Sequence, residues 1–290
     1  MKFWDWLTGR TGLAVDELAR RLDMPSDNLR GIRPKYSAFV IPKRAGGKRK
    51  ILAPSPELKA LQRRILHRVL GKLRVHPAVT GFQKGHSIVS NAAFHVGKAV
   101  VLRMDIADFF SNTAAKRVEN YFRKIGWNRE AAGLLTRLCT HEGGLPQGAP
   151  TSPRLGNLVN YRLDARLSGL GKRLGAAYTR YADDLTFSFR KDVPDTVRKV
   201  IRLTKAILKQ VGYRLHQRGR KLQIRRQHQR QCVTGLVVND QPALPREIRR
   251  WLRAVEHHVA TGRKTNLSPA ELDGWRALRS MVETQRDALR

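Results

Sequence analysis

The chain has 290 residues, with 57 lysines and arginines against 23 aspartates and glutamates, which gives a formal net charge of +34 at pH 7. Because 41% of the residues are hydrophobic, this composition excludes a disordered polycation and predicts a folded protein with a polyanionic partner, for which nucleic acid is favoured over a membrane. No apolar run is long enough to span a membrane and the two cysteines have neither zinc nor disulfide spacing, so we expect a cytoplasmic protein without membrane contact.

The first 30 residues predict a helical segment. Leu13, Leu18 and Leu22 fall on one face of a helix, and Pro25 starts a short second element. The pattern is that of half a DNA-reading helix-turn-helix. A basic amphipathic pair of helices that packs on a larger domain explains the same residues, and we favour it.

A β-hairpin and a further helix come next. Residues 36–52 predict two strands, with an apolar stretch at 37–42, a glycine-containing turn at 45–47 and a return through 48–52. Pro56 is suited to the first position of a helix. The apolar stripe predicted for that helix consists of Leu58, Leu61, Ile65 and Val69.

The remaining elements alternate between strands and helices. Strands are predicted for residues 98–104, 177–181 and 185–189, with two or three short strands between Gly212 and Asn239. Helices are predicted for 111–125, capped by Ser111 or Asn112, and for 128–139, 155–167, 194–211, 246–260 and 269–286. This order predicts an α+β body with a helical C-terminal appendage.

Three carboxylates stand out in a chain with few acids. Asp105 ends a predicted strand, and Asp183 and Asp184 occupy the tight turn between two others. Strand ends and turns of one sheet can bring three carboxylates to one point, and such a cluster suits two Mg²⁺ ions and a nucleoside triphosphate. Taken singly, Asp183-Asp184 is at least as well explained as an ordinary turn pair, and Asp105 as a residue at the start of a helix.

These carboxylates lie in segments that resemble the reverse transcriptases. Residues 181–184 (YADD) resemble the Tyr-x-Asp-Asp box of that family, residues 105–110 (DIADFF) its first aspartate motif, and residues 145–153 (LPQGAPTSP) its template-and-nucleotide loop. The hairpin at 41–49 is similar to the fingers motif, and Gly212-Tyr213 with Lys221 fits the next palm motif. The segments occur in the order of the family, and the resemblance covers roughly residues 36–240.

Two further segments resemble the bacterial retron branch. Residues 91–95 (NAAFH) resemble its Asn-Ala-x-x-His element, and residues 233–235 (VTG) its Val-Thr-Gly element. The alternatives are a satisfied histidine near a helix start and a strand bulge. The resemblance implies RNA binding by Asn91, His95, Val233, Thr234 and Gly235.

The family resemblance also implies a right-hand polymerase. Its parts would be an N-terminal helical segment (1–30), fingers (31–95), a palm of antiparallel sheet and helices with fingers insertions (96–240), and a short helical thumb (243–290). In the thumb, Arg246 and three further arginines recur at helical spacing, with Trp251 and Leu252 turned toward the core. We expect Arg249, Arg250 and Arg253 to bind an RNA backbone, with a solvated basic face as the alternative.

The remaining roles follow from matching the family's motifs residue by residue. Two Mg²⁺ ions would be bound by Asp105, Asp183, Asp184 and the backbone carbonyl of Ile106. Lys43 and Arg49 would bind the triphosphate, and Lys221 would lie near the pyrophosphate. Phe110 would exclude a 2′-hydroxyl, although a core phenylalanine is the competing interpretation. Gln147 and Gly148 would contact the incoming nucleotide and template.

The implied function is that of an RNA-directed DNA polymerase. It would copy part of a cognate structured noncoding RNA into single-stranded DNA, branched from a 2′-hydroxyl primer, using dNTPs. Its partners would be that RNA, the RNA–DNA product and a separate effector protein in antiphage defence. The alternatives are a diversity-generating reverse transcriptase, a group II intron-type reverse transcriptase and a non-catalytic polymerase relic that binds nucleic acid. A group II intron-type enzyme would usually carry a longer maturase region, for which we expect the residues after Pro242 to leave no room.

Overall fold

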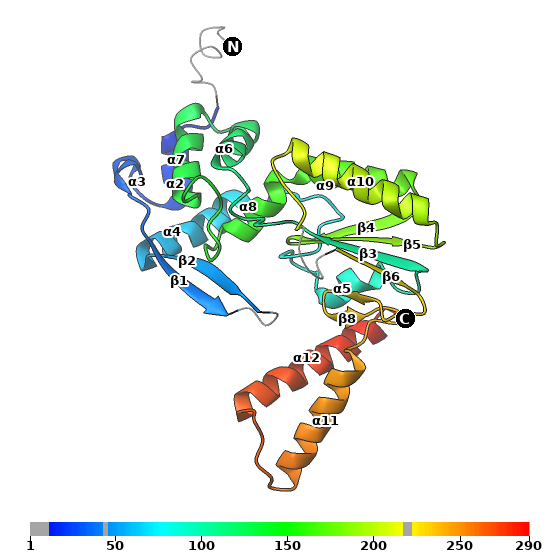
Figure 1. The fold of residues 1–290 in the computed structure, drawn as a ribbon. Helices are drawn as coiled ribbons and strands as arrows, with labels where there is room; N and C mark the ends of the chain where they lie inside the picture. Colours follow the sequence, from blue (N-terminus) through cyan, green and yellow to red (C-terminus); the bar gives the residue numbers. More distant parts are fainter. Residues whose placement is uncertain (1–11, 43–45, 217–221, 290) are drawn as a thin grey trace. The chain divides into compact units, whose positions relative to one another are not determined.

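The computed structural model describes residues 12–42, 46–216 and 222–289. The chain forms two compact units, each assembled from separate stretches of sequence (Figure 1). Unit 1 takes its residues from Met1–His76, Ala107–Ala165 and Leu208–Arg214, and unit 2 from Pro77–Ile106, Arg166–Ile207 and Leu215–Arg290. Residues 77–95, which the sequence placed in the fingers, group in this division with the sheet of unit 2, and the boundary between fingers and palm stays a prediction.

Unit 1 is a helical body with one β-hairpin. Its elements are α2 (Val15–Leu22), α3 (Ser26–Gly31), β1 (Tyr36–Pro42), β2 (Lys48–Pro54), α4 (Pro56–Ile65), the π-helical turn η1 (Leu66–Leu70), α6 (Ala115–Lys124), α7 (Arg129–Cys139) and α8 (Ser152–Val159). The predicted apolar stripe of α4 and η1 is buried in one core with α2, α6 and α7. In the hairpin, β1 and β2 pair antiparallel from Tyr36 opposite Pro54 to Pro42 opposite Lys48.

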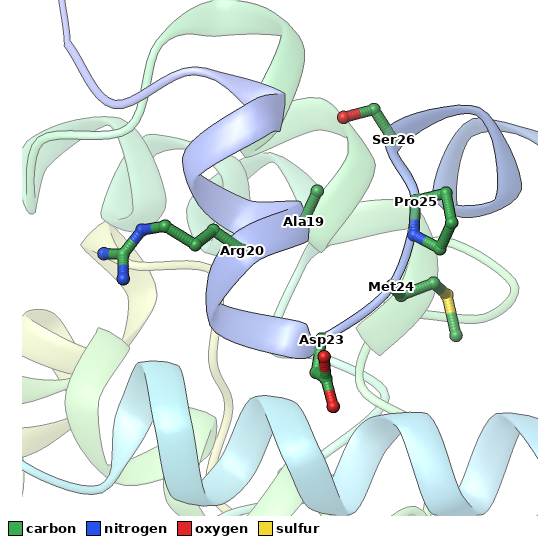
Figure 2. Close-up of a pocket in the computed structure, with 6 residues that line it drawn as sticks. All are labelled: Ala19, Arg20, Asp23, Met24, Pro25 and Ser26. Carbon is green, nitrogen blue, oxygen red and sulfur yellow. The ribbon is translucent and has the colours of Figure 1, made fainter.

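The N-terminal helices pack against the rest of unit 1. Leu18 and Leu22 of α2 and Leu29 of α3 are fully buried in its core, as the favoured amphipathic pair requires. A pocket lies at the turn between the two helices (Figure 2). Its lining residues are Ala19, Arg20, Asp23, Met24, Pro25 and Ser26. The Arg20 guanidinium is bound to Glu17 at 2.8 Å, and none of the lining residues is a predicted site residue.

Helix α6 begins later than its sequence suggests. Ser111 and Asn112 were predicted to cap it, but the helix starts at Ala115. The Ser111 hydroxyl donates to the carbonyl of Asp108, and the Asn112 amide donates to the carbonyl of Ala107. Both side chains therefore close the preceding turn, in which Asp108 has a φ of 46°. Local side-chain bonds of this kind compete with helix capping.

The single helix predicted for 155–167 is two helices, α8 and α9 (Tyr161–Arg173). They meet at Asn160, which is fully buried. Its amide donates to the carbonyl of Gly156 and to the hydroxyl of Tyr213, and its oxygen accepts from Arg117. Two of these partners, Tyr213 and Arg117, lie far away in the sequence, so the apolar periodicity gave no sign of the break.

Unit 2 is built on a four-stranded antiparallel sheet in the order β4-β5-β3-β6. These strands are β3 (Val100–Asp105), β4 (Ala176–Tyr181), β5 (Asp184–Phe189) and β6 (Leu222–Arg226). The other elements are α5 (Ile88–Ala93), α10 (Pro194–Gln210), β7 (Cys232–Val233), β8 (Leu236–Val237), α11 (Arg246–Ala260) and α12 (Pro269–Asp287). The sequence analysis did not predict α5, which is a single short helix.

The two faces of this sheet have different coverings. On one face, Gly171 of α9 is so close that an added Cβ would lie 3.4 Å from the Cβ of Tyr178, and α10 runs along the same side (Figure 1). On the other face, Val101 of β3 belongs to an apolar cluster with residues of α5, the β7–β8 hairpin and α12. Because side chains alternate along a strand, Arg103 and Asp105 lie on the same face as Val101.

In the ranges that the structure describes, no helix is long and apolar enough to cross a membrane. Cys139 and Cys232 are both free thiols. Burial raises the pKa of the Cys139 thiol to about 12.

Candidate active site

Two of the three predicted carboxylates lie side by side on neighbouring strands of the sheet of unit 2. Asp105 at the end of β3 is the direct antiparallel partner of Asp184 at the start of β5. Side chains of directly paired residues project from the same face with their Cβ atoms about 4.5–5.5 Å apart. Asp183 precedes Asp184 in the turn, and its carbonyl accepts a hydrogen bond of 3.0 Å from the backbone N–H of Ile106.

A buried side chain stabilises the turn that contains Asp183. Ala182 has a φ of 57°, a conformation that non-glycine residues seldom adopt. The side chain of Arg180 is fully buried, and its guanidinium donates to the carbonyl of Ala182 at 2.9 Å. A buried guanidinium that bonds a turn carbonyl fixes the direction in which the following Asp183-Asp184 pair leaves the turn.

Basic side chains lie beside these carboxylates. The guanidinium of Arg103 is 3.1 Å from the carboxylate of Asp184, and Nε2 of His216 is 3.3 Å from the carboxylate of Asp105. The backbone N–H of His216 also donates to the carbonyl of Asp105. The sequence analysis missed both residues. Arg103 could have been found, because it precedes Asp105 by two positions and so shares its face; for His216 no spacing gives a signal.

The donor set suits Mg²⁺, which prefers oxygen ligands. The side chains of Asp105 and Asp184 are 16% and 29% exposed, so both are accessible from solvent while sitting on a rigid sheet. Within the described ranges, no three acidic, histidine or cysteine side chains already form a metal cage. Arg103 instead forms an ion pair with Asp184, so a bound cation would have to replace Arg103 in neutralising the charge of that carboxylate.

The residues expected to bind the nucleotide belong to unit 1, apart from Lys43 and Lys221, which lie outside the described residues. Arg49 is exposed on β2. The carbonyl of Gln147 accepts a 2.8 Å hydrogen bond from the N–H of Leu52, which joins the loop at 145–148 to β2. Gly148 has a φ of 129°, and an added Cβ would lie 2.8 Å from the carbonyl oxygen of Leu52. The close approach that requires glycine is therefore made by the protein's own backbone.

Phe109 and Phe110 differ in burial. Phe109 is 4% exposed and stacks on Tyr213, with ring centroids 5.6 Å apart. Phe110 is half-buried, packs against the core of unit 1 and meets Phe109 edge-on at 5.3 Å. Phe109 is thus a core phenylalanine, and the exclusion of a 2′-hydroxyl by Phe110 stays a prediction.

Asn91 and His95 lie in the interior of unit 2. The Asn91 side-chain oxygen accepts from Thr80 at 2.8 Å, and the residue is 1% exposed. His95 is fully buried, with its two ring nitrogens 2.8 Å from the hydroxyls of Ser188 and Thr179. The structure differs here from the expected RNA contact, because these side chains have no exposed surface. His95 fastens α5 to the sheet face that carries Asp184.

The Val-Thr-Gly segment forms the turn between β7 and β8. Val233 is fully buried, whereas Gly235 is exposed and Thr234 half-buried. Thr234 and Gly235 have φ values of 47° and 85°, so the segment is a two-residue hairpin turn rather than a bulge. The Thr234 hydroxyl donates to the carbonyl of Ile88 at 2.9 Å. Only Thr234 and Gly235 of this element are accessible for an RNA contact.

Replacing His95 with glutamine should reduce stability and its pH dependence. Burial, with Lys98 nearby, lowers the pKa of His95 to about 3. The unfolded chain takes up that proton near pH 6.5, so the wild type should lose up to about 1.4 kcal/mol of stability per pH unit below pH 6.5 through this residue. The variant should not show this loss of stability at low pH, because glutamine does not titrate. It should be about 1–3 kcal/mol less stable than the wild type at pH 7.5, since one hydroxyl is left unpaired.

Urea unfolding at pH 7.5, 6 and 5 measures both effects. The matched control is His228→Gln, which removes an exposed histidine from the same unit. Equal pH slopes for wild type and His95→Gln would contradict the buried neutral state of His95.

The predicted arginine face lies on α11. Arg246, Arg249, Arg250 and Arg253 are all exposed, and Leu252 is fully buried. Trp251 differs from its prediction: it is 40% exposed and meets Trp275 of α12 edge-on at 5.2 Å. It therefore braces the pair of C-terminal helices instead of entering a core.

Comparisons with known proteins agree with the motifs. Residues 41–236 match the family described as reverse transcriptase (RNA-dependent DNA polymerase). The chain is 42% identical to the retron Mx162 reverse transcriptase of Myxococcus xanthus, over 79% of this chain and 53% of that protein. It is 39% identical to the retron Mx65 reverse transcriptase of the same organism, over 86% of this chain and 62% of that protein. It is 35% identical to the retron Ec86 reverse transcriptase of Escherichia coli, over 83% of this chain and 74% of that protein.

The chain thus spans only about half to three fifths of the two Myxococcus xanthus relatives. Among solved structures, it is similar to telomerase from Candida albicans in complex with a TWJ fragment of telomeric RNA, with a TM-score of 0.54 and 11% identity. That match covers 87% of this chain and 54% of the other, and it shows the fold alone. The α+β architecture is that of the right-hand polymerases, and the chain belongs to the reverse transcriptase family, in its retron branch.

Proposed function

We propose that this chain is an RNA-directed DNA polymerase that copies part of a structured noncoding RNA into single-stranded DNA in the cytoplasm. The observation that carries the proposal is the pairing of Asp105 with Asp184 across the sheet, with Asp183 next to them in the turn. The chain has a net charge of +34, and Arg103 and His216 lie beside the carboxylates of Asp184 and Asp105. A carboxylate pair at a partly exposed sheet end suits a cation site at a nucleic-acid-binding surface.

In the proposed reaction, Asp105, Asp183, Asp184 and the carbonyl of Ile106 would hold two Mg²⁺ ions. When bound, the ions supply charge neutralisation at the phosphates and activation of the primer hydroxyl. The rigid pairing of β3 with β5 fixes the spacing of the carboxylates before any ligand arrives. Arg49 would bind the triphosphate by its guanidinium fork and Lys43 by the point charge of its ammonium group, and Lys221 would lie near the pyrophosphate.

Recognition of the RNA would depend on the exposed basic surface. Arg249, Arg250 and Arg253 present guanidiniums from one helix, a spacing suited to a phosphate backbone. Thr234 and Gly235 offer a second accessible contact. The similarity to retron reverse transcriptases supports priming from a 2′-hydroxyl of the RNA, a branched product, and a separate effector protein in antiphage defence.

Primer extension tests the proposed activity. Purified protein is incubated with poly(rA) annealed to oligo(dT), dTTP and Mg²⁺, and extension of the primer is expected, with loss of extension when EDTA is added. Sequencing of the RNA that copurifies with the protein identifies the cognate template. Binding of the primer–template without extension would favour the non-catalytic relic instead.

Replacing Phe110 with valine should weaken the discrimination between deoxyribonucleotides and ribonucleotides. The half-buried Phe110 ring is the group that would collide with a 2′-hydroxyl, and loss of such steric selection changes a specificity ratio by about ten- to a hundredfold. The measurement is kcat/KM for incorporation of one dNTP and one rNTP. The matched control is Phe109→Leu in the core, which should lower stability without changing the ratio. An unchanged ratio for Phe110→Val would contradict the steric role.

A further inference from the structure

A short segment of unit 2 lies against the catalytic turn. Val79 forms an isolated parallel bridge with Arg180, the N–H of Thr80 donates to the carbonyl of Arg180 at 3.0 Å, and the N–H of Arg180 donates to the carbonyl of Ala78 at 2.8 Å. These bonds extend the edge of the sheet beside β4. They carry the chain directly to the turn that contains Asp183.

The next two residues have unusual backbone positions. A Cβ added to Gly81 would lie 2.7 Å from the backbone nitrogen of Ala182 and 3.1 Å from the Cα of Tyr181, so only glycine allows this approach. Phe82 then takes a φ of 57°, which is strained for a residue with a side chain. The Gln83 amide donates to the carbonyl of Phe82 at 3.0 Å.

This backbone presents an aromatic ring to solvent at the catalytic turn. Phe82 is 52% exposed, and its ring centroid lies 6.2 Å from that of Tyr181. Tyr181 is in turn the direct strand partner of Asp184. The ring gains little from packing, yet a strained backbone and a glycine hold it in place. Strain of this kind at a functional turn points to a ligand.

We propose that Phe82 is a primer-binding residue, whose ring packs against the terminal nucleotide of the primer strand. The proposal rests on the proposed polymerase function. The nucleotide that carries the reacting hydroxyl must reach the carboxylates, and therefore passes Tyr181 and its neighbour Phe82. Aromatic rings pack on nucleotides without selecting sequence, which suits a polymerase. Lys84, two residues on, is exposed and can meet the adjacent phosphate.

The test compares Phe82→Leu with Phe82→Tyr on a primer–template labelled with 2-aminopurine at the primer terminus, in EDTA without nucleotide. Loss of the aromatic ring should weaken binding by about five- to a hundredfold, whereas tyrosine should bind within about twofold of wild type. The fluorescence change of the terminal 2-aminopurine on binding should be lost in Phe82→Leu and kept in Phe82→Tyr. A 2-aminopurine placed well upstream should respond alike in all variants.

The matched control is Phe94→Leu, since Phe94 is 51% exposed in the same unit. Suppose that Phe82→Leu binds the primer–template as tightly as the wild type and gives the same terminal fluorescence change, while the wild type is active in primer extension. That result would overturn the primer contact and leave the polymerase function standing. Absence of extension by the wild type would instead overturn the polymerase function. If circular dichroism shows that Phe82→Leu is misfolded, the test is the fluorescence of terminal 2-aminopurine on binding to the wild-type protein. No change in that fluorescence would overturn the proposal.

Discussion

Replacing Asp183 and Asp184 together with asparagine is expected to lower the rate of primer extension by about a thousandfold or more, while RNA affinity changes by less than about threefold. Asparagine keeps the size of the side chain but removes the negative charge that a pair of divalent cations requires. RNA affinity should persist because it depends on the basic surface, and the exposed arginines of α11 are untouched.

Asparagine is the informative substitution here because of Arg103. The Nε of Arg103 is buried and has no hydrogen-bond partner, while its Nη2 bonds Asp184. Alanine at 184 would remove that partner from a half-buried guanidinium, with a stability cost of about 1–3 kcal/mol that obscures the catalytic effect. The asparagine oxygen can still accept from Arg103, so activity is lost with less disturbance of the fold.

Single-nucleotide extension, fluorescence anisotropy with the copurified RNA, and thermal unfolding together measure the outcome. The matched control is Asp192→Asn, which removes an acid of the same unit that is bound to Arg226 away from the turn. Extension by this variant should equal that of the wild type. Synthesis that persists in the Asp183→Asn, Asp184→Asn double variant would refute the assignment of the metal site.

The convergence of the carboxylates could be predicted because each lies at a strand end or turn and the segments resemble the motifs of one family. A strand that ends in Asp105 and a turn that contains Asp183 and Asp184 must meet if the two strands pair, and they do. The neighbours Arg103 and His216 were missed for different reasons. Arg103 follows from alternation along the strand, whereas His216 reaches Asp105 from a segment more than a hundred residues away, through contacts that no sequence spacing records.

Two other differences also depend on distant contacts. The break at Asn160 depends on a hydroxyl from Tyr213, and the buried state of His95 on two hydroxyls of the sheet. The late start of α6 instead depends on a local turn bond of Ser111. Motif matching singled out His95, but a motif does not say whether a polar side chain faces RNA or a neighbouring strand.

The Gly148→Ala variant is expected to disconnect the loop at 145–148 from β2 and to raise the KM for dNTP by about tenfold or more. Two costs combine at this position. At a φ of 129° an alanine is strained, and its Cβ would overlap the carbonyl oxygen of Leu52, which lies 2.8 Å from that position. Overlap of this kind adds about 1–3 kcal/mol to the cost of the backbone strain.

The matched control separates these two costs. Gly143 lies in the same loop region with a φ of 79°, but an added Cβ would meet nothing within 4 Å. Gly143→Ala should therefore lose only about 1–2 kcal/mol through backbone strain. Urea unfolding of the two variants should differ by the cost of the overlap, and only Gly148→Ala should impair nucleotide binding.

The kinetic effect follows from how β2 is held. The Leu52 N–H bonds the carbonyl of Gln147, and Arg49 lies three residues before Leu52 on the same strand. Displacement of Leu52 would move Arg49, so the loss should appear in the KM for dNTP more than in RNA affinity. If Gly148→Ala and Gly143→Ala had equal KM values, Gly148 would serve backbone conformation alone, and the coupling of the loop to β2 would not contribute to nucleotide binding.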